Sequence, residues 1–118
     1  MLLRGIAAAQ SALFAESRRL QASAHNRANT LTEGFQALRV TNLESAAPGS
    51  GVETQVHVLE PLGPPMVDAS GDVIGHESNV SFVDEALTRL TAQRAYEANL
   101  VSLQAQVDTT DELLDVVG

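Results

Sequence analysis

Hydrophobic residues recur with a heptad period over residues 81–117 and predict one long amphipathic helix. The spacings alternate between four and three, which puts the apolar positions in two adjacent rows: Leu100, Val107 and Leu114 in one, and Tyr96, Leu103, Thr110 and Val117 in the other. Upstream the pattern is less regular and runs through Ala86, Leu90 and Gln93. Ser81 and Asp84 suit the cap and the first turn of this helix, and neither Gly nor Pro interrupts it before Gly118.

The predicted length of this helix has a structural consequence. A helix over residues 81–117 would be about 55 Å long. A compact domain of this chain length is only about 35 Å across. The helix is therefore expected to extend beyond its own domain, so that its apolar seam needs another surface to cover it.

A second amphipathic helix is predicted near the N-terminus, over residues 2–31, with its end near Asn29. Its heptad row is Ile6, Leu13 and Leu20, and smaller residues fill the turns between them. Thr30, Thr32 and Gly34 favour the end of the helix. Because alanine buries little area, this helix is expected to gain little stability from packing when the chain is alone.

The sequence predicts short strands in the middle of the chain. Alternating residues predict a half-buried strand over residues 52–59, and branched and aromatic residues indicate a strand over residues 35–42. Pro48 and two glycines mark a flexible connector at 45–51, and Ser70, Gly71 and Asp72 indicate a hairpin within residues 66–75.

The predicted fold class is mainly α with a small β insert. Two long terminal α-helices form a coiled-coil-like pair around a short β-hairpin and strand module. We divide the chain into an N-terminal helix with its junction (1–34), the β-rich insert (35–78) and the long C-terminal helix (79–118), the two helical parts serving assembly.

Composition and charge exclude several kinds of partner and site. The net charge is -8, which disfavours binding to nucleic acid or insertion into an anionic membrane. The first forty residues hold five arginines against two glutamates, whereas the rest hold two arginines against thirteen acids. Opposite ends of the chain should therefore attract each other, within one molecule or between neighbours. There is no cysteine, so disulfides and thiolate sites are excluded.

Catalysis and metal binding find little support in the sequence. His25, His57 and His76 have no ligand spacing on one helix face. Asp68 and Asp72 loosely resemble the start of a calcium loop, but a solvated turn accounts for them better. Ser, His and Asp are all present, yet nothing marks a nucleophile, so we expect no enzyme and no cofactor; a small hydrolase or metal enzyme is the rival class.

The N-terminus imitates a signal peptide, with Arg4 followed by Gly5, Ile6 and alanines. Because Gln10 interrupts the apolar stretch and the helical period continues through the supposed cleavage zone, we expect no cleaved signal peptide. No apolar run is long enough to cross a bilayer.

Polar residues also stand along the predicted helix seams, namely Asn26, Asn29, Gln93, Arg94 and Asn99. The simpler interpretation is that they are ordinary exposed residues. The alternative is that they fix register and partner choice, as polar seam residues do in coiled coils.

Two stretches together resemble a known family. Residues 24–35, AHNRANTLTEGF, resemble the N-terminal signature of bacterial flagellar rod and hook proteins. Residues 78–85, SNVSFVDE, followed by residues 92–99, AQRAYEAN, resemble the C-terminal signature of the same family. Between them, GVE at 51–53 and the later PP and VD pairs look most like the C-type proximal rod proteins. Glu33 and Ser78 stand where the family usually has proline, and the segment 66–79 is shorter than usual.

The resemblance implies a structural subunit of the flagellar basal-body rod, the periplasmic drive shaft that transmits torque. Such subunits are exported by the flagellar type III apparatus without a cleaved signal peptide, and they polymerise through terminal helices with copies of themselves and other rod proteins. The implied junction residues are Asn26, Ala28, Asn29, Thr32, Gly34 and Phe35, and the implied C-terminal packing residues are Asn79, Val80, Arg94, Tyr96 and Asn99. We add the heptad residues Leu13, Leu20, Leu100, Leu103, Val107 and Leu114 to the expected assembly surface.

The same seams are compatible with a different class of protein. A stand-alone coiled-coil dimer or adaptor would use them to reach a fixed stoichiometry, whereas a rod subunit would remain monomeric or form open-ended assemblies.

Overall fold

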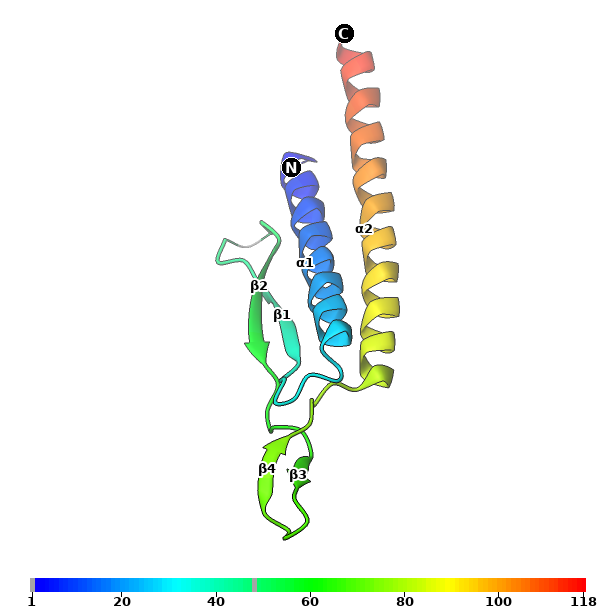
Figure 1. The fold of residues 1–118 in the computed structure, drawn as a ribbon. Coiled ribbons are helices and arrows are strands. Elements are labelled where there is room, and N and C mark those ends of the chain that lie inside the picture. Colours follow the sequence, from blue (N-terminus) through cyan, green and yellow to red (C-terminus); the bar gives the residue numbers. More distant parts are fainter. Residues whose placement is uncertain (1, 48) are drawn as a thin grey trace.

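The computed structural model describes residues 2–47 and 49–118 and has six elements in chain order (Figure 1). They are α1 (Leu2–Ala28), β1 (Leu38–Glu44), β2 (Val52–Val58), β3 (Pro65–Val67), β4 (Val73–His76) and α2 (Phe82–Val117). The two long helices flank the β insert in the sequence, so the predicted fold class of a mainly α chain with a small β insert is confirmed.

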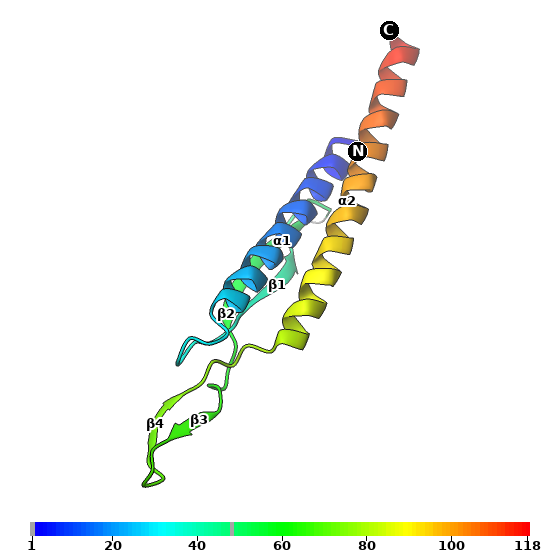
Figure 2. The ribbon, with the colours of Figure 1, turned by 45° about the vertical axis from the view of Figure 1, so that its right-hand side comes forward.

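The helices lie side by side and run in opposite directions (Figures 1 and 2). Ser81 caps α2, because its Oγ accepts a hydrogen bond from the Asp84 N–H at 3.4 Å. At the other end, the Gly118 N–H donates to the Leu114 carbonyl at 2.7 Å. With 36 residues against 27 in α1, α2 is the longer helix, and its C-terminal end continues past the start of α1 (Figure 1).

The molecule is a thin rod. Its extents are 80 × 26 × 14 Å and its radius of gyration is 20.3 Å. A compact domain of this length would have a radius of gyration of about 13 to 14 Å. The expectation that the C-terminal helix outgrows a compact domain is therefore confirmed.

The hairpin β1–β2 packs along α1, and β1 also contacts α2 through the ion pair of Arg39 with Glu85 (Figure 1). The two strands pair antiparallel from Leu38 opposite Val58 to Glu44 opposite Val52. The Val52 N–H donates to Ser11 Oγ at 3.1 Å, which fixes the far end of the hairpin to the middle of α1. As a result, α1 is the central element and is covered on two faces.

The second hairpin, β3–β4, extends past the ends of both helices (Figure 2). Its turn is closed by the Asp68 carboxylate, which accepts from the N–H groups of Ser70 at 2.8 Å and Asp72 at 3.0 Å. Gly71 follows with φ +90°, a conformation that favours glycine. The Asp68 carboxylate therefore has a structural role in the turn.

Two expectations about the first hairpin need correction. The strand expected over 35–42 begins at Leu38 and ends at Glu44, because residues 35–37 form hydrogen bonds in the junction instead. The second strand was expected to be half buried along its length. Val56 and Val58 are instead 44% and 48% exposed, since α1 covers only the part of β2 nearest Val52.

The interior is built from small and polar side chains. Among the described residues, the buried hydrophobic ones are all alanines: Ala9, Ala15, Ala37 and Ala92. The largest fully buried side chains are those of Glu85 and Asn26. Because alanine buries little apolar area, this interior contributes little hydrophobic stabilisation.

Candidate assembly interface

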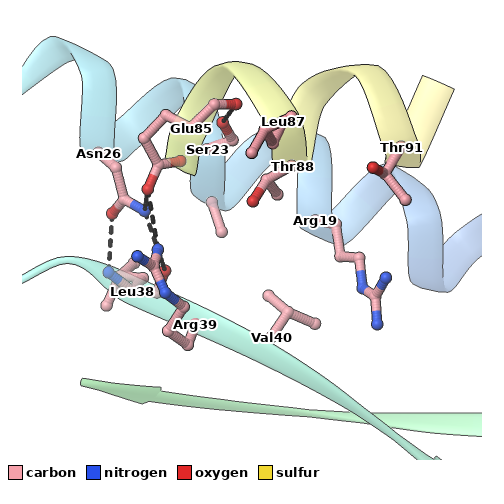
Figure 3. A pocket seen from close by; sticks show the side chains of 11 residues that line it. Arg19, Ser23, Asn26, Leu38, Arg39, Val40, Glu85, Leu87, Thr88 and Thr91 are labelled. Atoms are coloured by element: carbon pink, nitrogen blue, oxygen red, sulfur yellow. Dashed lines mark hydrogen bonds and ion pairs between the residues drawn. The ribbon is translucent and has the colours of Figure 1, made fainter. Parts of the chain in front are cut away.

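Asn26 joins three elements at the end of α1 (Figure 3). Its side chain is 1% exposed and pairs with the backbone of Leu38 in both directions. The Leu38 N–H donates to Asn26 Oδ1 at 2.7 Å, and Asn26 Nδ2 donates to the Leu38 carbonyl at 2.9 Å. The same Nδ2 group also donates to Glu85 Oε1 at 2.9 Å. A single amide therefore sets where β1 starts relative to both helices.

Glu85 is the acidic centre of this junction. Arg39 Nη1 of β1 donates to its Oε1 at 2.8 Å, and Ser23 Oγ of α1 donates to its backbone carbonyl at 3.3 Å. The other carboxylate oxygen, Oε2, is buried without a hydrogen-bond partner among the described residues. A cavity of about 260 Å³ lies beside the junction, lined by residues of α1, β1 and α2 (Figure 3).

Asn79 makes a second junction from the segment before α2. Its Oδ1 accepts from the Ala37 N–H at 2.6 Å, and its Nδ2 donates to the carbonyls of Leu59 and Pro61, both at 2.9 Å. Its own N–H donates to the Phe35 carbonyl at 3.1 Å. Asn79 thus binds both strands at the open end of the first hairpin, where the Leu59 N–H also donates to the Ala37 carbonyl at 2.7 Å.

The other residues expected at the exit of α1 form a chain of local contacts. Asn29 Nδ2 donates to the His25 carbonyl at 2.9 Å, and Thr32 Oγ1 donates to Asn29 Oδ1 at 3.1 Å. Gly34 has φ +72°, and its N–H donates to a β4 carbonyl at 2.7 Å. The ring of Phe35 lies edge-on to that of His25, with centroids 5.5 Å apart.

Two expected residues at this junction make fewer contacts. Ala28 is exposed at the last position of α1. Val80 is half buried before α2, and its N–H donates to Ser78 Oγ at 3.2 Å. The structure therefore brings Asn26, Asn79, Phe35 and their neighbours together around one chain crossing and leaves Ala28 at its edge.

The face that α2 turns toward α1 differs from the strongest apolar row in the sequence. Asn26 meets Glu85 at one end of the helix pair, and Gly5 lies against the side chain of Gln106 at the other. The heptad row between these contacts is Glu85, Ala92, Asn99 and Gln106. Ala92 is buried and Asn99 is half buried, with its Nδ2 donating to the Ala95 carbonyl at 2.8 Å.

The small residues of α1 explain this choice. Gly5, Ala9 and Ser23 leave room for only short side chains or end-on polar groups between the helices. Leu13 and Leu20 are half buried on α1, and Tyr96 and Leu103 are half buried on α2. The two helices therefore lie close together, with only a thin layer of side chains between them.

The row Leu100, Val107 and Leu114 stands one position after the row that faces α1, which turns it by about 100° around the helix axis. These three residues are 48%, 42% and 63% exposed. Gln93 and Arg94 are exposed as well. The upstream positions Ala86 and Leu90 also face outward.

Large apolar side chains are exposed over much of the molecule. On α2 they run from one end to the other: Phe82, Val83, Leu87, Leu90, Leu100, Val101, Val107, Leu113, Leu114, Val116 and Val117. Leu3, Phe14 and Leu31 add to this surface near α1. Large apolar side chains exposed in this number are typical of interaction sites.

Sequence reasoning missed Glu85, Arg39 and Ser23 as parts of the junction. Glu85 stands in the first turn of α2, where the helix dipole alone is enough to explain an acidic residue. The signal that could have identified it is its position seven residues before Ala92, in the row that faces α1. An acid in that row needs buried partners, and the nearby strand supplies Arg39.

The described ranges contain no group of three or more acidic, histidine or cysteine side chains able to hold a metal ion. Within the same ranges, no helix has the length and apolarity that crossing a bilayer requires.

Comparison with known proteins places the chain in a family. No protein-family model matches it. The chain is 37% identical over 110 residues to flagellar basal-body rod protein FlgC of Salmonella typhimurium strain LT2, with 78% of this chain and 80% of the relative covered. The protein of the same name from Escherichia coli O157:H7 is 36% identical with the same coverage. The chain therefore belongs to the family of flagellar basal-body rod protein FlgC.

Proposed function

We propose that this chain is a structural subunit of the proximal rod of the flagellum, which polymerises through its two terminal helices into the drive shaft and transmits torque. The observation that carries the proposal is the inverted distribution of apolar side chains. Alanines and polar groups fill the interior, whereas the leucines and valines of α2 face outward. Membership of a family of rod proteins supplies the biological setting.

The energetics of the lone chain support assembly. Fully burying one leucine or valine side chain is worth about 1.5 to 3 kcal/mol. The exposed row Leu100, Val107 and Leu114 leaves about half of this stabilisation unused in the single subunit. Fixing each residue of a helix costs about 1 to 2 kcal/mol of conformational entropy. Neighbours that cover α2 would offset that cost, so assembly should need a growing end where several neighbours meet.

The proposed partners follow from this function. They are other copies of this chain, other flagellar rod proteins and the flagellar type III export apparatus, with no role for nucleic acid, membrane insertion or a cofactor. The proposed location is the periplasmic rod of the basal body, reached without a cleaved signal peptide. We assign no catalytic activity to the chain.

Sedimentation of the purified subunit tests the mode of assembly. A rod subunit should be monomeric at low concentration and should form open-ended assemblies of increasing size as its concentration rises. A single dimer whose size does not change with concentration would instead support the free-standing adaptor and overturn the proposal.

A genetic test addresses the location. Basal bodies isolated from the source bacterium should contain this chain, and deletion of its gene should abolish both the rod and swimming. Basal bodies that lack the chain but retain a complete rod would contradict the proposed function.

A further inference from the structure

A basic groove lies where the end of α1 meets the beginning of α2. It has a volume of about 410 Å³ and is lined by Arg27, Phe82, Ala86, Arg89, Leu90 and Gln93. The lining has two arginines and no acid. Neither arginine forms an ion pair with any residue that the structure describes. The groove therefore presents unneutralised positive charge beside apolar surface.

The opposite end of α2 has the complementary character. Residues 111–118 are all exposed, and the helix there continues past α1 (Figures 1 and 2). Four carboxylates share one side at helical spacing: Asp108, Asp111, Glu112 and Asp115. The neighbouring side is apolar and carries Val107, Leu114 and Val117. We call residues 107–117 the acidic tip.

We infer that the acidic tip of one subunit docks into the basic groove of a second copy. The inference rests on the proposed function and deepens it by naming two surfaces that meet. Asp111 and Asp115 would face Arg27 and Arg89, while the apolar side of the tip covers Phe82 and Leu90. Arginine forks suit carboxylates, and apolar contact beside the pairs excludes water from them.

The position of the two surfaces determines what they can build. They lie at opposite ends of α2, so one molecule cannot join its own tip to its own groove. Copies related by a shift along the helix axis can make the contact repeatedly. From the middle of the tip, near residue 112, to the middle of the groove, near residue 87, the shift is about 38 Å. Such a head-to-tail contact produces an open chain of subunits.

The contact is small because only the last three turns of a helix enter the groove. Interfaces of this size are weak when formed singly. A single tip therefore binds its neighbour briefly, and stable assembly requires several neighbours at once. The contact sets axial order without making the free subunit aggregate at low concentration.

Cysteine cross-linking of the full chain tests the contact directly, because the natural sequence has no cysteine. Val117→Cys places a thiol on the apolar side of the tip and Gln93→Cys places one in the groove. Mixing the two variants under mild oxidation should give cross-linked dimers about tenfold faster than mixing Val117→Cys with Gln104→Cys, an exposed position on α2 outside the groove. Equal rates for the two mixtures would overturn the inference.

Charge reversal identifies the arginines as the cause. Arg27→Glu with Arg89→Glu should slow the cross-linking of tip to groove about tenfold. Arg4→Glu with Arg18→Glu, which changes the net charge equally at exposed positions of α1, should leave the rate nearly unchanged. An equal loss with both pairs of reversals would show a general charge effect and contradict the docking. Circular dichroism checks that all variants keep the helix content of the parent.

A charge swap completes the test. Asp111→Arg with Asp115→Arg on the tip should restore the cross-linking rate to the Arg27→Glu, Arg89→Glu groove, and a rate that stays low contradicts direct pairing. Failure of the contact and failure of the proposed function are distinguishable. If cross-linking is absent while isolated basal bodies contain the chain, only the docking of tip to groove is wrong.

Discussion

Asn26 and Asn79, one from each terminal part of the chain, bind consecutive residues of a single backbone segment. Asn26 Oδ1 accepts from the Leu38 N–H at 2.7 Å, and Asn79 Oδ1 accepts from the Ala37 N–H at 2.6 Å. The exit of α1, the start of β1 and the approach to α2 are thereby held at one point. This crossing fixes the direction in which the two helices leave the β insert.

The Asn26 amide should be essential for the junction. Asn26→Ala leaves the N–H and C=O of Leu38 and the buried carboxylate of Glu85 without this partner. We expect a loss of about 2 kcal/mol in the free energy of unfolding. Thermal denaturation in an osmolyte that strengthens burial measures the loss. Asn29→Ala, whose side chain makes an exposed bond to the His25 carbonyl, is the control and should cost well under 1 kcal/mol.

The Arg39–Glu85 pair should matter more than its partial exposure suggests. Arg39→Met removes the cation from a carboxylate that is 1% exposed, so the charge of Glu85 is left with fewer partners. We expect a loss of about 1 to 3 kcal/mol in the free energy of unfolding, with solvent screening at Arg39 reducing the upper end. Urea denaturation measures it. Arg18→Met, at an exposed arginine of α1, should change stability by less than about 0.5 kcal/mol, and equal losses in the two variants would contradict the role of the pair.

Asn79→Asp is predicted to loosen the first hairpin while leaving the helices intact. The aspartate still accepts from the Ala37 N–H, but it turns a second acceptor toward the carbonyls of Leu59 and Pro61. Ionised oxygen facing two carbonyl oxygens is repulsive. Amide hydrogen exchange should become faster at Leu38 and Leu59 and stay unchanged in the middle of α2. Unchanged exchange in the hairpin would show that the Asn79 donors are dispensable.

The exposed row of α2 should serve assembly and contribute little to the fold of one subunit. The triple variant Leu100→Gln, Val107→Gln and Leu114→Gln should keep the unfolding temperature of the monomer within a few degrees, because about half of each of these residues is already in contact with water. It should fail to enter basal bodies when it replaces the natural chain. Ala92→Gln should have the opposite effect and lower the unfolding temperature of the monomer. Ala92 is fully buried, and a larger side chain there forces the helices apart. A triple variant that assembles normally would contradict the assigned surface.

Much of the architecture could be predicted from the sequence. The ends of both helices follow from Ser81, Gly118 and the polar residues after Ala28, since caps and turn residues act over a few positions. The hairpin around Gly71 follows from local turn chemistry for the same reason. Such features depend on neighbours in the chain and need no knowledge of distant contacts.

The rotation of α2 could not be predicted in the same way. Leu100, Val107 and Leu114 form the strongest apolar row, yet the structure turns Ala92, Asn99 and Gln106 toward α1. A heptad pattern records which face is covered in the final assembly and does not say by which chain. Within one subunit, the small residues of α1 select the small residues of α2, and the larger apolar row is left outside.

The burial of Glu85 and the position at which β1 starts could not be predicted from the sequence either. Both depend on Asn26, a polar residue whose partners lie on two other elements. Spacing alone made Asn26 look like an ordinary surface position. Only the geometry of three elements meeting shows that its amide binds both backbone groups of Leu38 and the carboxylate of Glu85.

An interior built from alanine bears on how such a molecule behaves under force. Among the described residues no large apolar side chain is buried, so pulling the two helices apart breaks few apolar contacts, and a machine that pulls on the free chain would unfold it with modest work. The stiffness of the rod would then come from contacts between packed subunits. Each free subunit would stay easy to deform until it is incorporated.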